Sequence, residues 1–271
     1  MLKPKHNKIS YLADGVYSMY GDEAPFQALS DLLDKYEQFH LYVDDAHGTG
    51  WAGENGSGIV RKRMKYHHER MVMTISLNKS FGAAGGAIVF ANEAQKRLVR
   101  SCGGTLIFSG PIQPPMLGAA CASAELHLNS AIRSLQTNLL NLIHLCNQAI
   151  GKYGLPQVEQ NESPIFFIPV GQLDLSTEIV KRVMNDGYNV NVAGYPAVPM
   201  NRSGIRFMMN LHLTPIDVEN LMQSISRNYK NVLVKNGIKE SHVANIFKIP
   251  LFQLGRGYYA CSDYDQPSPK K

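Results

Sequence analysis

The sequence predicts an α/β fold: a mostly parallel sheet in a larger domain, followed by a smaller C-terminal α+β domain. Two observations lead to this expectation. Short apolar runs alternate with segments of helical periodicity along residues 9–100, the pattern of strand–helix units that build a parallel sheet. A stretch almost free of helix breakers, residues 116–150, then precedes a second alternation of strands and helices.

The N-terminal part begins with an apolar run at residues 9–13, which we expect to be a strand. Ala24 and Pro25 then open a helix, because proline is tolerated in a first helical turn. The next expected elements are strands at 41–43, 71–77 and 87–90, the last of them buried, and a polar helix at about 92–100. Residues 1–115 are therefore expected to belong to the larger domain.

The C-terminal part begins with residues 116–150, a connecting segment expected to be one long helix or two in succession. Residues 151–235 are predicted to form the small domain, with strands at 165–170, 188–192 and 204–210 and a helix at 176–185. Thr214, Pro215 and Asp217 suit the N-cap, first and third positions of its last helix. Residues 236–271 read as a C-terminal extension whose end is disordered.

Composition excludes several classes of protein. The chain has 271 residues, 44% of them hydrophobic, but no apolar run near the ~20 residues that span a bilayer. Its net charge of +5, from 27 basic and 22 acidic side chains, is too mild and dispersed to predict a nucleic-acid partner. The four cysteines show neither disulfide nor metal-ligand spacing, and the first residues of the sequence lack the apolar stretch of a signal peptide. We therefore expect a cytoplasmic protein with no transmembrane segment and no bound metal.

Chemically versatile side chains follow two of the expected strands. Asp44 and His47 come after the strand at 41–43, and Lys79 comes after the strand at 71–77, ahead of a glycine-rich turn. A buried carboxylate can keep a pyridine nitrogen protonated, and a lysine can form a Schiff base with an aldehyde. Ser76 and the amides at 82–86 could bind a phosphate. Together these groups match the needs of pyridoxal 5'-phosphate (PLP).

Each residue also has a simpler explanation when it is taken alone. Asp44 and Asp45 could cap a turn, His47 could be an ordinary loop histidine, and Lys79 could be a surface lysine. The glycines could mark nothing more than a tight turn. The combination in this order and spacing favours the cofactor site, since independent accidents would have to coincide.

Four stretches give the chain a family resemblance. They are DGVYSMYGDEAP at 14–25, VDDAHGTG at 43–50, SLNKSFG at 76–82 continuing to Gly86, and YPAVP at 195–199 with Ile205 and Arg206. In this order they resemble the α-oxoamine synthase family of fold-type-I, aspartate aminotransferase-like PLP enzymes. That family includes 8-amino-7-oxononanoate synthase, glycine C-acetyltransferase, 5-aminolevulinate synthase and serine palmitoyltransferase. The resemblance covers roughly residues 8–230.

The resemblance implies roles for particular residues. Lys79 would be the Schiff-base lysine and the base that removes the α-proton. Asp44 would pair with the pyridine nitrogen and His47 would contact the phenolic oxygen. Ser18 would line the cofactor and Ser76 would bind its phosphate. Arg206 would hold the carboxylate of the amino-acid substrate, a task that suits its planar fork of donors.

The resemblance also implies a reaction and an assembly. The enzyme would condense an amino acid with an acyl-CoA, usually with decarboxylation, and would work as a homodimer with its active site at the interface. Residues 1–115 would be the C-terminal portion of the PLP-binding large domain, so we expect an N-terminally truncated or split product that aggregates when alone. The alternatives are an aminotransferase-type enzyme of class I/II and a catalytically inactive fragment.

Overall fold

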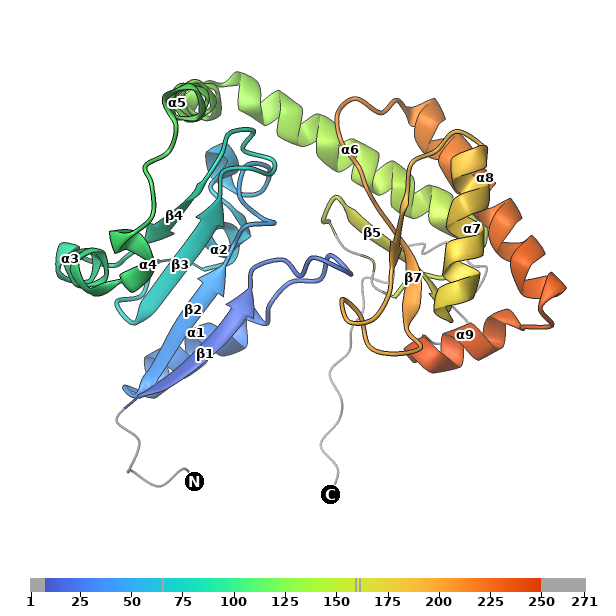
Figure 1. Cartoon of the computed structure of the whole chain (residues 1–271), viewed down its shortest axis with the longest axis horizontal. Helices are drawn as coiled ribbons and strands as arrows, with labels where there is room; N and C mark the ends of the chain where they lie inside the picture. Colours follow the sequence, from blue (N-terminus) through green and yellow to red (C-terminus); the bar gives the residue numbers. More distant parts are fainter. Residues whose placement is uncertain (1–7, 65, 159, 161, 250–271) are drawn as a thin grey trace. The chain divides into compact units, whose positions relative to one another are not determined.

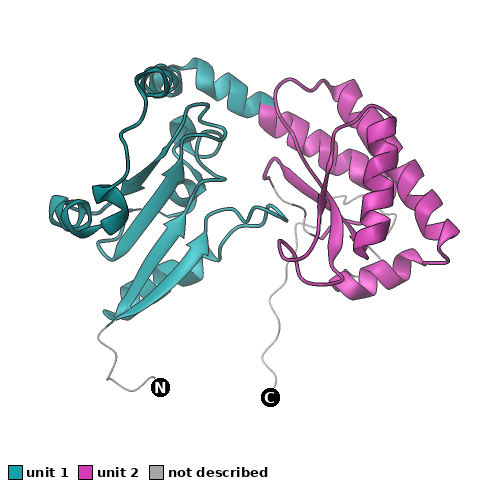
Figure 2. Cartoon of the chain, viewed as in Figure 1, with its two compact units in different colours: residues 1–138 teal, residues 139–271 magenta. Residues whose placement is uncertain are grey.

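The computed structural model describes residues 8–64, 66–158, 160 and 162–249. The chain divides into two compact units, with the division between Asn138 and Leu139 (Figure 2). Unit 1 contains the sequence motifs around Asp44 and Lys79, and unit 2 contains Arg206. Each unit has its own sheet and its own buried core.

Unit 1 is built on a sheet of four strands in the order β1-β2-β3-β4 (Figure 1). The strands are β1 (Ile9–Asp14), β2 (Phe39–Asp44), β3 (Met71–Ser76) and β4 (Gly86–Val89). The pairings of β1 with β2 and of β2 with β3 are parallel, and β4 runs antiparallel to β3. The expected mostly parallel sheet is confirmed, and the first three strands lie where the apolar runs predicted them.

The two faces of this sheet differ in burial. Leu41 and Val43 of β2 and Met71 and Met73 of β3 are buried, and the side chains that alternate with them are more exposed. The helices α1 (Phe26–Lys35) and α2 (Ile59–Arg63) bury apolar side chains of their own, and α1 packs on β2. Asp44 therefore shares the more open face, because side chains alternate along a strand.

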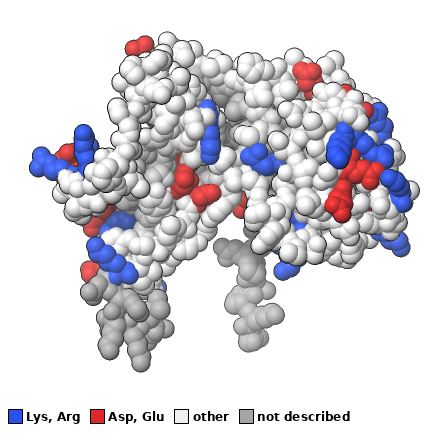
Figure 3. Space-filling model, viewed as in Figure 1, with Lys and Arg blue, Asp and Glu red and all other residues white. Residues whose placement is uncertain are grey.

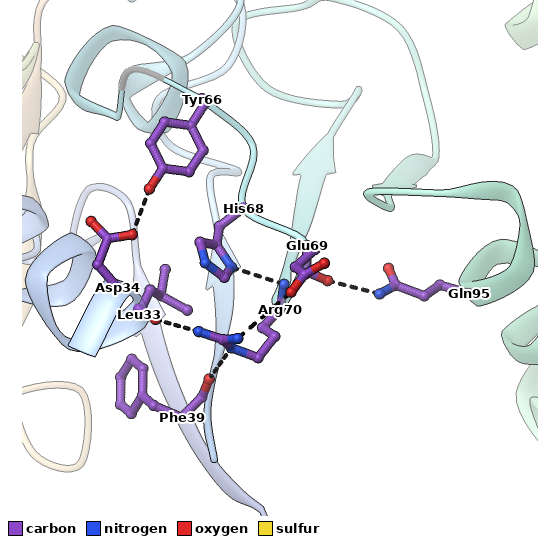
Figure 4. Close-up of polar contacts among 8 residues, drawn as sticks. All are labelled: Leu33, Asp34, Phe39, Tyr66, His68, Glu69, Arg70 and Gln95. Carbon is purple, nitrogen blue, oxygen red and sulfur yellow. Dashed lines mark hydrogen bonds and ion pairs between the residues drawn. The ribbon is translucent and has the colours of Figure 1, made fainter. Parts of the chain in front are cut away.

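Arg70, just before β3, binds the amino end of this strand to α1 and β2 (Figure 4). Its guanidinium donates to the carbonyl oxygens of Leu33, in α1, and Phe39, at the start of β2, the latter at 3.2 Å. The carbonyl oxygen of Glu69 accepts a hydrogen bond from the side chain of Gln95 at 2.8 Å. Gln95 lies in α3 (Glu93–Cys102), so this bond attaches α3 to the segment before β3. These contacts lie at the amino ends of the parallel strands and leave the carboxyl ends for other groups.

β4 corrects one expectation. The sequence predicted a buried strand at 87–90, but Gly86, Ala87 and Ile88 are exposed, and Ile88 keeps 42% of its surface accessible. Among the strands that the structure describes, β4 pairs only with β3 and so lies at the edge of the sheet. Apolar composition reports the preference of a segment for burial, not the presence of a partner that covers it.

The connecting segment consists of two helices, α5 (Pro114–Leu128) and α6 (Ala131–Lys152). Of the two possibilities left open by the sequence, two successive helices is the correct one. Asn129 separates them in an extended conformation, and its side chain accepts from the backbone amide of Ala131 at 3.1 Å. A short helix, α4 (Gly104–Ile107), precedes α5.

Unit 2 has an antiparallel sheet in the order β5-β7-β6. Its strands are β5 (Ile165–Gly171), β6 (Asn191–Ala193) and β7 (Ser203–Met208), and α7 (Leu173–Asn185) packs on all three. Ile168 and Ile205 are fully buried and pair across the strands, and Phe166 stacks on Phe207 with ring centroids 5.4 Å apart. The small α+β domain expected from the sequence is therefore present.

Two helices complete unit 2. α8 (Pro215–Lys235) starts with the predicted capping box, in which the Thr214 hydroxyl accepts from the amide of Asp217 and the Asp217 carboxylate accepts from the amide of Thr214. α9 (Glu240–Phe247) was not predicted, yet it buries Val243 and Ala244 and packs on β5. Its short apolar stripe gave too little periodicity to identify it. The expected disordered end lies outside the described residues.

The charged surface of unit 2 is of mixed sign (Figure 3). Glu178 pairs with both Arg182 and Lys235, and Asp186 pairs with Arg227. Exposed pairs of this kind are screened by solvent and contribute little to stability. Among the helices that the structure describes, none combines the length and the apolar composition that crossing a bilayer requires.

Candidate active site

The candidate site residues of unit 1 follow the carboxyl ends of three adjacent strands. The strand register aligns Asp14 of β1 with Asp44 of β2 and Asp44 with Thr74 of β3. Ser76 ends β3, and Lys79 lies in the turn just after it. Open α/β sheets present their ligand-binding groups at this edge. The strand that ends in Asp44 and the strand that precedes Lys79 are thus neighbours in the sheet.

Asp14 shows that the charges at this edge interact. Burial raises the pKa of the Asp14 carboxyl, the negative charge of Asp44 raises it further, and the positive charge of Lys79 lowers it. Two carboxylates and one ammonium group therefore lie within electrostatic range of one another. Sequence reasoning did not select Asp14 as a site residue, although its place at the end of the first strand was an available signal.

Asp44, the last residue of β2, and Asp45, which follows it, differ in burial and in hydrogen-bond partner. Asp44 is half-buried, and its Oδ1 accepts from the backbone amide of Ala46 at 2.8 Å. Asp45 is fully buried, and its Oδ2 accepts from the amide of Val60 at 3.2 Å. This difference leaves Asp44 available to a ligand and turns Asp45 into the group that receives the first amides of α2.

Glycines surround the Asp45 carboxyl on three sides. A Cβ atom at Gly15, Gly48 or Gly58 would lie 2.5, 2.1 or 2.0 Å from one of its oxygens. Burial raises the pKa of Asp45 to about 7, against the lowering effect of the amides of Val60 and Ile59. Asp45 Oδ1 has no hydrogen-bond partner among the described residues. The carboxyl therefore titrates near neutral pH inside a closed cage.

The loop that carries His47, residues 44–58, contains the short helix η1 (Glu54–Gly56) and is held by several bonds. Trp51 Nε1 donates to the carbonyl oxygen of His47 at 2.6 Å. Gln136 Nε2, from α6, donates to the carbonyls of Trp51 and Gly53 at 2.7 and 2.8 Å. His47 itself is half-buried. Helix α6 thus holds the loop at Trp51 and Gly53, and Trp51 in turn binds the backbone of His47.

The Lys79 turn lies directly against this loop. A Cβ atom at Gly50, where φ is +95°, would lie 2.6 Å from the amide nitrogen of Phe81 and 2.7 Å from the carbonyl carbon of Ser80. Only glycine fits this contact, on grounds of both space and backbone conformation. The turn is closed by the Gly82 amide, which donates to the Lys79 carbonyl at 2.9 Å. Asp44, His47 and Lys79 are therefore carried by two segments in direct contact.

The remaining predicted residues occupy different settings. Ser76 is half-buried, and its hydroxyl donates to Asn78 Oδ1. Ser18 lies, half-buried, in the segment between β1 and α1. Arg206 is in unit 2, on β7 between Phe167 and Asn191 of the neighbouring strands. It is half-buried, and desolvation lowers the pKa of its guanidinium.

The fold matches that of solved PLP enzymes. A serine palmitoyltransferase variant of S. paucimobilis with a bound PLP–myriocin aldimine superposes with a TM-score of 0.76 at 20% identity, over 86% of this chain and 57% of that one. An 8-amino-7-oxononanoate synthase of Francisella tularensis superposes with a TM-score of 0.70 at 22% identity, over 84% of this chain and 65% of that one. The fold is therefore that of the fold-type-I PLP-dependent transferases.

Sequence comparison identifies the family. The model of the family described as aminotransferase class I and II matches residues 3–225. The 8-amino-7-oxononanoate synthase of Thermosipho melanesiensis is 30% identical over 216 residues, which are 80% of this chain and 54% of the relative. The chain belongs to the aminotransferase class I and II family. It spans about half the length of the curated relatives that it matches.

Proposed function

We propose that the protein is a PLP-dependent acyltransferase of the α-oxoamine synthase type, which condenses an amino acid with an acyl-CoA. The observation that carries the proposal is the contact between the Lys79 turn and the loop of Asp44 and His47, through Gly50. A lysine and a carboxylate thus lie on adjacent segments that follow the carboxyl ends of parallel strands, where open α/β sheets commonly bind ligands. The similarity to 8-amino-7-oxononanoate synthases favours this reaction within the family.

The residues present fit the proposed cofactor chemically. PLP offers an aldehyde, a pyridine nitrogen and a phosphate, which call for an amine, a carboxylate and hydrogen-bond donors. Lys79, Asp44 and the hydroxyl of Ser76 are groups of these three kinds, and all follow the carboxyl ends of β2 and β3. A Cβ atom at Gly82 would meet nothing within 4 Å, so the turn borders open space. When bound, the cofactor would supply a ring that stabilises negative charge on the substrate α-carbon.

The side chains of this chain would share the remaining work. Asp44 would hold a proton on the pyridine nitrogen by charge pairing. His47 would donate to the phenolic oxygen, and Ser18 would line the ring. The Lys79 amine would accept the α-proton of the substrate, for which it must be neutral at that moment. Asp14, whose carboxyl interacts with both Asp44 and Lys79, would modulate this charge balance.

Further parts of the proposal concern the substrates and the setting. Arg206 would pair its guanidinium with the carboxylate of the amino acid, a task that suits its planar fork of hydrogen-bond donors. We propose a cytoplasmic homodimer with its active site at the interface. The domain division proposed is 1–115, 116–150, 151–235 and 236–271.

To test the proposal, the protein is incubated with amino acids and acyl-CoA thioesters in the presence of PLP. The release of free CoA is measured. The proposal expects CoA release that depends on both substrates and disappears in Lys79→Ala. A matched control is Lys181→Ala, on the exposed surface of α7. Amination of an oxo acid without CoA release would instead support an aminotransferase. Folded protein that performs neither reaction would support the inactive alternative.

A further inference from the structure

His127 contacts both of the segments that carry the candidate site. It lies in the last turn of α5 and is buried, with 8% of its surface exposed. Its Nε2 donates to the carbonyl oxygen of Gly50 at 3.1 Å, in the loop of Asp44 and His47. Its ring also stacks on Phe81, two residues after Lys79, with centroids 4.8 Å apart and planes inclined by 21°.

Ser123, one helical turn earlier, adds a second contact with the Lys79 turn. Its hydroxyl donates to the carbonyl oxygen of Phe81. His127 Nδ1 lies 2.8 Å from the carbonyl oxygen of Ser123, so the ring has a hydrogen-bond acceptor on each side. The spacing of Ser123 and His127 puts them on one face of α5. This face therefore contacts the ring and the backbone of Phe81 together.

Glycines leave the space that the histidine ring occupies. A Cβ atom at Gly56 would lie 2.5 Å from His127 Cδ2 and 3.0 Å from its Nε2. Gly56 and Gly50 both have positive φ values, +71° and +95°, so a substitution there is strained as well as crowded. The ring therefore packs directly against the loop, and a smaller side chain at position 127 would leave a void there.

We propose that His127 is a positioning residue, which with Ser123 holds the Lys79 turn against the loop of Asp44 and His47. Lys79 itself is exposed, so the direction of its side chain depends on how firmly its turn is anchored. The anchor is Phe81, whose ring and carbonyl are both bound by α5. Small displacements of a reacting group reduce rates strongly. The effect on chemistry rests on the proposed function, while the effect on loop order does not.

The first test measures order directly, by amide hydrogen exchange on the full chain without cofactor. In His127→Ala we expect exchange to speed up by about tenfold at residues 46–53 and 77–83, as one lost hydrogen bond would cause. Exchange in β5, in unit 2, should stay at the wild-type rate. His144→Ala, an exposed histidine on α6, is the matched control and should change neither segment.

Two further variants separate the contacts. His127→Phe keeps an aromatic ring against Phe81 but lacks a donor for Gly50, so it should loosen residues 46–53 more than 77–83. Ser123→Ala should speed amide exchange at residues 77–83 more than at 46–53. This variant replaces His127→Ala as the test if the latter does not fold. If folded His127→Ala exchanges at the wild-type rate in both segments, the proposal is wrong. If His127→Ala does not fold, the same result in Ser123→Ala overturns the proposal.

The second test measures the consequence for Lys79. In His127→Ala with PLP, we expect borohydride to fix the cofactor to Lys79 about tenfold more slowly, and kcat to fall with little change in the KM of the amino acid. Added imidazole should restore part of the trapping rate and part of kcat. Wild-type trapping rates in a chain whose loops have loosened would refute the positioning role. A wild-type chain that binds no PLP would refute the proposed function and leave the exchange test standing.

Discussion

Asp45→Asn is predicted to change how stability depends on pH. The asparagine keeps an oxygen that accepts from the amide of Val60, but it cannot ionise. In the wild-type chain, burial raises the pKa of the Asp45 carboxyl from 3.8 to about 7. The cage of Gly15, Gly48 and Gly58 closes the site, so the charged form gains little from solvent.

The sign follows from which state holds the proton. Below pH ~4 both folded and unfolded chains are protonated at Asp45, and above pH ~7 both are ionised. Between these values only the folded chain keeps the proton, so the free energy of unfolding falls as the pH rises. The slope is about 1.4 kcal/mol per pH unit, and the total loss from this group is about 4 kcal/mol. The asparagine variant should lose none of it.

Urea unfolding followed by Trp51 fluorescence measures the effect in unit 1. Trp51 is the single tryptophan of the chain, and it lies in the same loop as Asp45, residues 44–58. Relative to the wild type, Asp45→Asn should gain about 2 to 3 kcal/mol between pH 5 and pH 7. Asp31→Asn, on the exposed side of α1, is the matched control and should run parallel to the wild type. A parallel profile for Asp45→Asn would refute the reasoning.

Two other predictions concern packing and capping. Gly48→Ala puts a Cβ atom 2.1 Å from Asp45 Oδ1 and should cost about 2 kcal/mol or more in the Trp51 unfolding assay. Gly118→Ala, a helical glycine whose Cβ would meet nothing within 4 Å, should be neutral or stabilising, and equal effects of the two would contradict the cage. Thr214→Ala removes the capping box of α8 and should cost about 1 kcal/mol of the stability of unit 2, measured by circular dichroism in urea. An unchanged midpoint would show that the cap contributes nothing.

Sequence reasoning succeeded where local signals suffice. The strands that became β1, β2 and β3 are apolar runs bounded by turn residues, and the start of α8 combines an N-cap threonine with proline and aspartate. The sequence also placed Asp44 at the end of the second of these strands and Lys79 shortly after the third, as the fold has them, and their roles in a cofactor site stay predictions. These features depend on the order of residues within a short window, which the sequence displays.

It failed where the outcome depends on tertiary partners. β4 is apolar but exposed, and α9 is short but buried against β5. Asp44 and Asp45 are adjacent and of the same residue type, but only Asp45 is fully buried. The sequence cannot show which of two adjacent residues lies on the covered face of a sheet. His127 is distant in sequence from Gly50 and Phe81, so no local sequence pattern could predict its contacts with them.

Cofactor trapping tests the central claim, that Lys79 is the lysine that binds PLP. The full chain is mixed with PLP, its visible absorption is recorded, and borohydride is added before peptide mapping. We expect a visible band that borohydride removes, with the pyridoxyl group on the peptide that contains Lys79. Lys79→Ala should show neither, and Lys181→Ala should show both. A folded wild-type chain with no band, or with the label on other lysines, would contradict the account.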